Sequence, residues 1–144
     1  MRLAAVGCRW LLGALFLVAG CAKALDPGGF VRDIDGYRML EGPLLVGAAF
    51  FIPFFEVAVG TALVLRWPYR GAVLAAGGML TMFLVALVQA WARGLDINCG
   101  CFGDGPGLFG YPWWVARDAA MLLACAVCWT EATKGPGPDE GGAR

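Results

Sequence analysis

Residues 71–92 read GAVLAAGGMLTMFLVALVQAWA, a continuous apolar run that contains no charged side chain. The hydrocarbon core of a bilayer is about 30 Å thick, and about 20 helical residues cross it. This stretch therefore predicts a transmembrane helix. Its many glycines and alanines are the small residues that allow membrane helices to approach each other closely.

The composition places the whole chain in the same class. Hydrophobic residues make up 60% of the 144 residues and charged residues 15%, whereas a soluble domain carries about 25% charged residues. The formal net charge is zero, which gives no signal for nucleic-acid binding. We predict an all-α, polytopic membrane four-helix bundle over residues 1–133, with a disordered tail at 134–144. The four predicted helices cover residues 3–25, 43–65, 71–92 and 113–130.

The first of these segments allows two interpretations. Arg9 and Lys23 interrupt its apolar run, and both long side chains can reach the membrane interfaces from a retained helix. The alternative is a cleaved signal peptide, because Val18-Ala19-Gly20-Cys21 resembles a lipoprotein cleavage site. We favour the retained helix.

The balance of Lys and Arg residues gives the predicted orientation, because cytoplasmic loops carry an excess of these residues. With four helices, six basic residues lie on the side of the termini and five on the other side. Two arginines in the short connection 66–70 favour cytoplasmic termini. We therefore predict an inner-membrane protein whose connection 93–112 faces outwards. The basic residues on the side of the termini are Arg2, Arg9, Arg66, Arg70, Lys134 and Arg144. Those on the other side are Lys23, Arg32, Arg38, Arg93 and Arg117.

Cysteine is the residue that carries candidate chemistry, because the sequence contains six cysteines and no histidine. The lack of histidine removes the commonest metal ligand and the usual general base. Cys99 and Cys101 lie in the connection 93–112 with one glycine between them. A disulfide across a single residue is strained, and strained, exposed disulfides are labile or catalytic. We predict a redox pair, with a structural role or half of a metal site as alternatives. Two thiolates do not complete a zinc site, so no metal is predicted.

The remaining cysteines are weaker candidates. Cys125 and Cys128 have the spacing of a redox C-x-x-C motif, but they lie deep in an apolar helix, where thiols stay protonated. We interpret them as packing residues. Cys21 lies near the predicted outer end of the first helix, where it is either a third thiol for the loop pair or another packing residue.

Glu56 is a candidate because a carboxylate within a membrane helix is costly and usually functional. Pro53 frees a backbone carbonyl one turn earlier and favours a kink towards a polar interior. The functional interpretations are a proton relay or a hydrogen-bond partner for a membrane quinone. The alternative is a neutral carboxylic acid hydrogen-bonded to Gln89 or to another helix. Near the outer end we also expect Arg117 and Asp118 to pair with Lys23 and Asp26.

These residues together resemble the MauE branch of the MauE/DoxX redox-associated membrane proteins, over roughly residues 12–126. The Cys-Gly-Cys-Phe-Gly motif is the most specific part of the resemblance. The residues that carry it are Leu17 to Gly20 with Lys23, Asp26, Pro27 and Phe30; Ile52, Pro53, Glu56 and Gly60; Cys99 to Gly103; and Trp113 with Arg117.

The resemblance implies a retained first helix, a four-helix bundle and a role beside thioredoxin-like proteins. For the MauE branch it implies methylamine utilisation, through disulfide formation in the small subunit of methylamine dehydrogenase. We therefore expect thiol–disulfide oxidoreduction through Cys99 and Cys101 with an extracytoplasmic thioredoxin-like partner, and a membrane quinone as the candidate cofactor. The alternatives are a non-enzymatic assembly or scaffold subunit, and a DoxX-type small subunit of a quinone-linked oxidoreductase.

Overall fold

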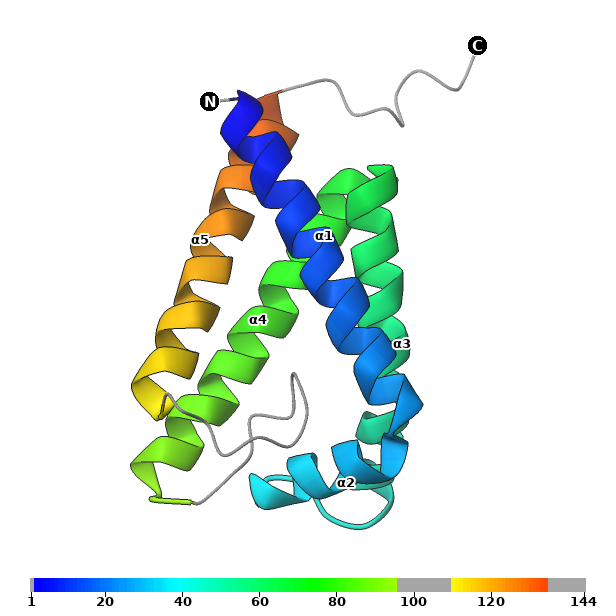
Figure 1. The fold of residues 1–144 in the computed structure, drawn as a ribbon, viewed down its shortest axis with the longest axis vertical. Coiled ribbons are helices and arrows are strands. Elements are labelled where there is room, and N and C mark those ends of the chain that lie inside the picture. Colours follow the sequence, from blue (N-terminus) through cyan, green and yellow to red (C-terminus); the bar gives the residue numbers. More distant parts are fainter. Residues whose placement is uncertain (1, 96–109, 135–144) are drawn as a thin grey trace.

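The computed structural model describes residues 2–95 and 110–134, and in these ranges the chain is helical throughout, with short connections (Figure 1). The predicted all-α membrane bundle of four long helices is confirmed. A fifth, shorter helix packs at one end. The helices are α1 (Arg2–Leu25), α2 (Pro27–Gly36), α3 (Pro43–Leu65), α4 (Tyr69–Ala92) and α5 (Tyr111–Lys134).

The short helix α2 lies between the first two predicted membrane helices, where no helix was predicted. Its start follows ordinary capping rules. The Asp26 side chain accepts a hydrogen bond from the Gly29 amide at 2.8 Å, and Pro27 occupies the first turn, where its missing amide hydrogen is harmless. Phe30 anchors the helix because its side chain is buried.

Among the described residues, α1, α3 and α4 are long and apolar enough to cross a membrane. Helix α5 is as long as α4, but Arg117 and Asp118 lie within its apolar stretch. These two side chains form an ion pair with each other. The chain is a multi-pass membrane protein, and many of its large apolar side chains face outwards, as lipid-facing residues do.

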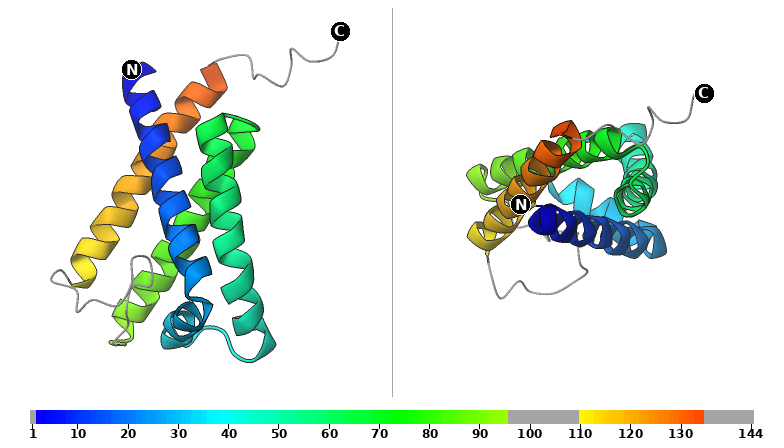
Figure 2. Two further views of the ribbon diagram at one scale, coloured as in Figure 1. Left: turned by 45° about the vertical axis from the view of Figure 1, so that its right-hand side comes forward. Right: turned by 90° about the horizontal axis from the view of Figure 1, so that it is seen from above.

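The bundle has two distinct ends. The start of α1, the end of α5 and the turn between α3 and α4 lie at one end, while α2, the end of α4 and the start of α5 lie at the other. We call these the terminal end and the α2 end. Helices α1 and α5 come together towards the terminal end and separate towards the α2 end (Figures 1 and 2).

Helix α1 makes its most extensive contacts with α3, and three glycines explain how the two backbones approach. A Cβ on Gly60 would lie 2.9 Å from the Gly13 carbonyl oxygen, and a Cβ on Gly20 would lie 2.8 Å from the Pro53 carbonyl oxygen. These distances are too short for any side chain. Small residues thus bring α1 and α3 together, whereas a Cβ on Gly77 or Gly78 of the stretch 71–92 would meet nothing within 4 Å.

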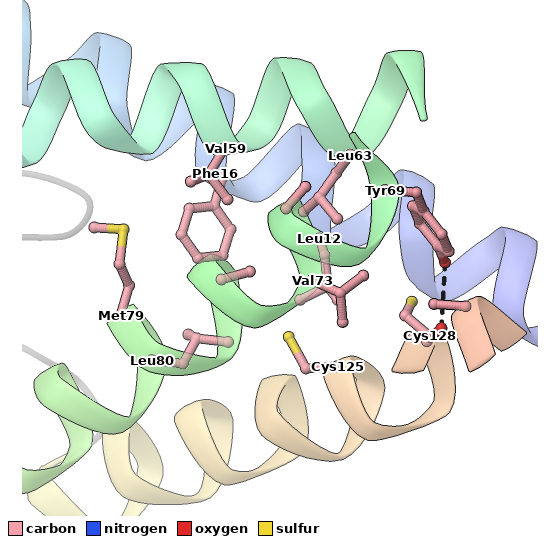
Figure 3. Close-up of a cluster of buried hydrophobic side chains, with 13 residues drawn as sticks. Leu12, Phe16, Val59, Leu63, Tyr69, Val73, Met79, Leu80, Cys125 and Cys128 are labelled. Atoms are coloured by element: carbon pink, nitrogen blue, oxygen red, sulfur yellow. Dashed lines mark hydrogen bonds between the residues drawn. The ribbon is translucent and has the colours of Figure 1, made fainter. Parts of the chain in front are cut away.

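The main apolar core fills the terminal half of the bundle (Figure 3). Leu12, Leu63 and Cys128 are completely or almost completely buried there, and Cys125 is 5% exposed. The Tyr69 hydroxyl donates a hydrogen bond of 3.5 Å to the Cys128 carbonyl. The core is thus apolar and closely packed, with two thiols inside it.

Arginines bind the carbonyl groups at two helix C-termini of this end. Arg9 donates to the carbonyls of Leu63 and Val64 at 3.1 and 2.8 Å, and Arg70 donates to the carbonyl of Ala132 at 3.0 Å. The last carbonyls of a helix lack partners within it and attract positive charge. These arginines therefore complete the ends of α3 and α5.

A smaller cluster at the α2 end joins α4 to α5. Leu87 and Ala90 are buried against aromatic side chains that include Tyr111 and Trp114. The Tyr111 ring stacks on Trp91 with a centroid distance of 6.0 Å, and the Tyr111 hydroxyl donates to the Leu95 carbonyl. The two sides of the connection between α4 and α5 are therefore held together.

Candidate functional site

The candidate site is a buried ion pair between α1 and α3. The Lys23 ammonium lies 2.6 Å from Glu56 Oε1, and the two side chains are 3% and 4% exposed. An unpaired charge in the membrane interior is very costly, whereas a hydrogen-bonded pair neutralises both groups. The pair explains how Glu56 is tolerated in the middle of an apolar helix.

Helix geometry explains why these two residues meet. Helices α1 and α3 run antiparallel (Figure 1), and side chains tilt towards the N-terminus of their own helix. Lys23 lies near the end of α1 and leans towards the bundle interior, while Glu56 leans back towards the α2 end. The close approach at Gly20 and Pro53 brings the two helices near enough for contact.

Two aromatic rings complete the surroundings of the Lys23 ammonium. It lies 5.1 Å from the centroid of the Phe30 ring and 4.9 Å from that of Phe83. A cation over an aromatic face is stabilised by the ring quadrupole, more strongly where water is excluded. Helix α2 therefore contributes directly to the site, because it supplies Phe30.

A second ion pair lies close by on α5. The Arg117 Nη2 and Nε atoms donate to Asp118 Oδ1 at 2.8 and 3.0 Å, and the Asp118 side chain is 5% exposed. The expected pairing of Arg117 and Asp118 with Lys23 and Asp26 is wrong. Lys23 instead pairs with Glu56, and the Asp26 side chain caps the N-terminus of α2.

Both ion pairs line one cavity of about 140 Å³ between α1, α3, α4 and α5. Apart from these charged groups its walls are apolar, with Phe16, Leu80 and Met121 among them. A second cavity of about 230 Å³ lies between α2, α3 and α4 and shares Lys23 and Phe83 with the first. The ion pair of Lys23 and Glu56 thus stands beside internal space rather than in a closed core.

One polar atom of the site lacks a partner among the described residues. Glu56 Oε2 is buried and accepts no hydrogen bond there, and the same holds for the side-chain oxygen of Gln89. The suggested hydrogen bond between Glu56 and Gln89 is therefore wrong. The partner of Glu56 is Lys23 of α1, and the two form an ion pair, not the hydrogen bond of a neutral carboxylic acid. An unpaired buried acceptor is uncommon and indicates a missing donor or a functional role.

The cysteines fall into three groups. Cys125 and Cys128 are free and buried, as their interpretation as packing residues requires. Cys21 is free and exposed on α1, so the suggestion that it packs inside the bundle is wrong. The predicted redox pair, Cys99 and Cys101, lies outside the described residues, between Leu95 and Gly110.

Sequence reasoning singled out Glu56 but missed its partner. A signal was available, because Lys23 is a basic residue inside one predicted helix and Glu56 is the acidic residue of another. Opposite charges within membrane helices tend to pair with each other. The contacts of Phe30 and Phe83 with Lys23 could not be inferred, since the positions of these rings depend on α2 and on the rotation of α4.

Comparison with known proteins places this arrangement in a family. The family model described as methylamine utilisation protein MauE matches residues 1–131, which include every helix residue of the site. The chain belongs to the MauE family. This confirms the resemblance to the MauE branch that the sequence motifs indicated.

A relative from Paracoccus denitrificans, the methylamine utilization protein MauE, is 32% identical over 98 residues. The aligned part covers 67% of this chain and 53% of the relative, so the match spans about half of the relative's length. No solved structure matches this MauE-family chain.

Proposed function

We propose that this MauE-family protein exchanges thiols and disulfides at the outer face of the inner membrane, as part of methylamine utilisation. The observation that carries the proposal is the Cys99-Gly100-Cys101 motif in a membrane protein of this family. A disulfide across one residue is strained and is therefore a ready donor to a second pair of thiols. The partner is an extracytoplasmic thioredoxin-like protein, and the end product is a disulfide of the methylamine dehydrogenase small subunit.

The position of the flanking residues supports this role. Leu95 and Gly110, which border the segment that contains the pair, lie at the α2 end of the bundle. Lys23 and the two cavities lie nearer to this end than to the terminal end. Arg9 and Arg70 lie at the terminal end, where they bind helix carbonyls, and the positive-inside rule favours this end as the cytoplasmic one.

Thiol oxidation also releases protons, and this gives Glu56 a role. Its carboxylate lines the first cavity, and it retains an oxygen without a partner among the described residues. In this proposal Glu56 relays protons from the outer face. Cys21 is exposed on α1 near the α2 end, and its action as a third thiol is part of the same proposal.

The proposal is tested by trapping thiols in cells with a maleimide reagent that changes gel mobility. We expect Cys99 and Cys101 to shift between alkylated and protected forms when an oxidant is added. Cys99→Ser and Cys101→Ser should each abolish the protected form and leave the methylamine dehydrogenase small subunit short of disulfides. The matched control is Cys125→Ser, which removes a buried thiol.

Two results would contradict the proposal. If Cys99 and Cys101 remain alkylatable under every condition, the pair is not redox-active. If both serine variants support full growth on methylamine, the protein acts as an assembly subunit instead. Co-purification with a large catalytic subunit would indicate the small-subunit alternative.

A further inference from the structure

The cavity beside Glu56 has a chemical character that restricts what it can hold. Among the described residues, its charged lining groups are Lys23, Glu56, Arg117 and Asp118, two positive and two negative side chains, so this part of the wall has no formal net charge. A neutral wall gives no advantage to an anionic lipid or to a metal ion. The remaining walls are apolar and suit an uncharged molecule with a hydrophobic body.

The size of the cavity argues against simple hydration. A water molecule takes about 30 Å³ of liquid volume, and buried waters need two to four polar partners each. A cavity of about 140 Å³ offers hydrogen-bond partners at its two ion pairs, Lys23 with Glu56 and Arg117 with Asp118, but not along its apolar walls. A ligand with one polar edge and an apolar remainder satisfies the walls better than a group of waters.

The polar edge must offer a hydrogen-bond donor. Glu56 is 97% buried, and its Oε2 atom accepts no hydrogen bond from the described residues. A ligand hydroxyl at this oxygen would remove the energetic penalty of an unpaired buried acceptor. Lys23 beside it has three N–H groups and can also donate to a carbonyl oxygen.

We propose that this cavity binds the ring of a membrane quinone, an inference that rests on the proposed function because thiol oxidation needs an electron acceptor. Two thiols lose two electrons and two protons as their S–S bond forms. The quinone takes up these two electrons and two protons and becomes a quinol. The carbonyl of the oxidised ring accepts from Lys23, and the hydroxyl of the reduced ring donates to Glu56 Oε2.

The second cavity offers space for the hydrocarbon tail of the quinone. It shares Lys23 and Phe83 with the first cavity and is lined mostly by apolar side chains, including Phe30, Ile52 and Met82. Its volume of about 230 Å³ receives the first part of a hydrocarbon tail. The ring and tail of one ligand thus lie on the two sides of Lys23.

The test measures binding directly, without turnover. The full-length protein in lipid nanodiscs is titrated with a decyl-substituted benzoquinone, and binding is followed by quenching of tryptophan fluorescence. Ala19→Leu adds bulk to a residue that lines the first cavity, while Ala22→Leu makes the same change at an exposed position three residues later. We expect Ala19→Leu to weaken binding about tenfold or more, which corresponds to about 1.4 kcal/mol, and Ala22→Leu to leave it unchanged.

A second variant probes the polar edge. Glu56→Gln replaces a carboxylate oxygen by an NH₂ donor, so it should weaken binding of the quinol more than that of the quinone. Equal affinity of wild type and Ala19→Leu, no saturable binding, or equal competition by decanoate would each overturn the assignment.

The Cys99→Ser, Cys101→Ser double variant separates the two proposals. If this double variant binds quinone as the wild type does, the result supports the quinone site. The redox role of Cys99 and Cys101 is decided by the thiol trapping alone.

Discussion

The two ends of the bundle solve the problem of polar groups in a membrane in opposite ways. At the terminal end, arginines lie at the edge and bind helix carbonyls, and the interior is an apolar core that contains two thiols. At the α2 end, charged side chains are drawn into the interior as ion pairs, and cavities remain beside them.

The two ends therefore differ in what they contribute to the stability of the bundle. A closely packed apolar core contributes stability through burial and dispersion contacts. A buried ion pair contributes little or nothing to stability relative to an apolar pair of the same size. Stability alone therefore does not explain the ion pairs at the α2 end, whereas the buried thiols of the terminal end behave as small apolar side chains.

The largest effect is expected from breaking the ion pair on one side. Lys23→Met and Glu56→Leu should each lower the free energy of unfolding by about 3–5 kcal/mol, because one buried charge is left without its partner. The double variant should lose much less than either single variant. Equilibrium unfolding in mixed micelles measures all three, with the exposed Arg32→Met as control. A double variant that is as unstable as the sum of the two would contradict the pairing.

A smaller effect is expected at the crossing of α1 and α3. Gly60→Ala places a Cβ at 2.9 Å from backbone atoms of Gly13 and Leu17, so the helices must move apart at a cost of about 1–3 kcal/mol. Gly47→Ala in the same helix meets nothing within 4 Å and should be neutral or mildly stabilising. The same unfolding measurement compares them. Equal stability of the two variants would show that the backbone contact is unimportant.

The smallest effect is expected in the terminal core. Cys125→Ala removes one buried sulfur and should lower stability by about 1 kcal/mol through lost packing, with no change in thiol trapping of Cys99 and Cys101. The exposed Cys21→Ala should change stability by less than about 0.5 kcal/mol. Thermal unfolding of the wild type, Cys125→Ala and Cys21→Ala measures these differences in stability. A change in the redox state of Cys99 in the Cys125→Ala variant would show that the buried thiol takes part in the chemistry.

The fold class could be predicted because hydropathy is a local property. The run at residues 71–92 and the burial of Cys125 both follow from the neighbouring residues in the sequence. Helix α2 could also have been predicted, since Asp26 followed by Pro27 is a recognised start signal. It was missed because the segment around it is polar and rich in turn residues.

The partner of Glu56 could not be predicted in the same way. Which residue meets Glu56 depends on the register and rotation of α1 against α3, and these are set by contacts at Gly13, Gly20 and Gly60. Such contacts join residues far apart in sequence. The aromatic faces around Lys23 depend in turn on the placement of α2 and α4, which one sequence does not reveal.

The hydrogen bond from Tyr111 to the Leu95 carbonyl has a consequence for how this protein can diversify. Since helices α4 and α5 already hold both borders of the intervening segment, inserting residues there adds little loop-closure entropy. The bundle can thus act as a fixed base on which segments of different length and sequence are exchanged. Relatives could vary that segment alone, without remaking the helices.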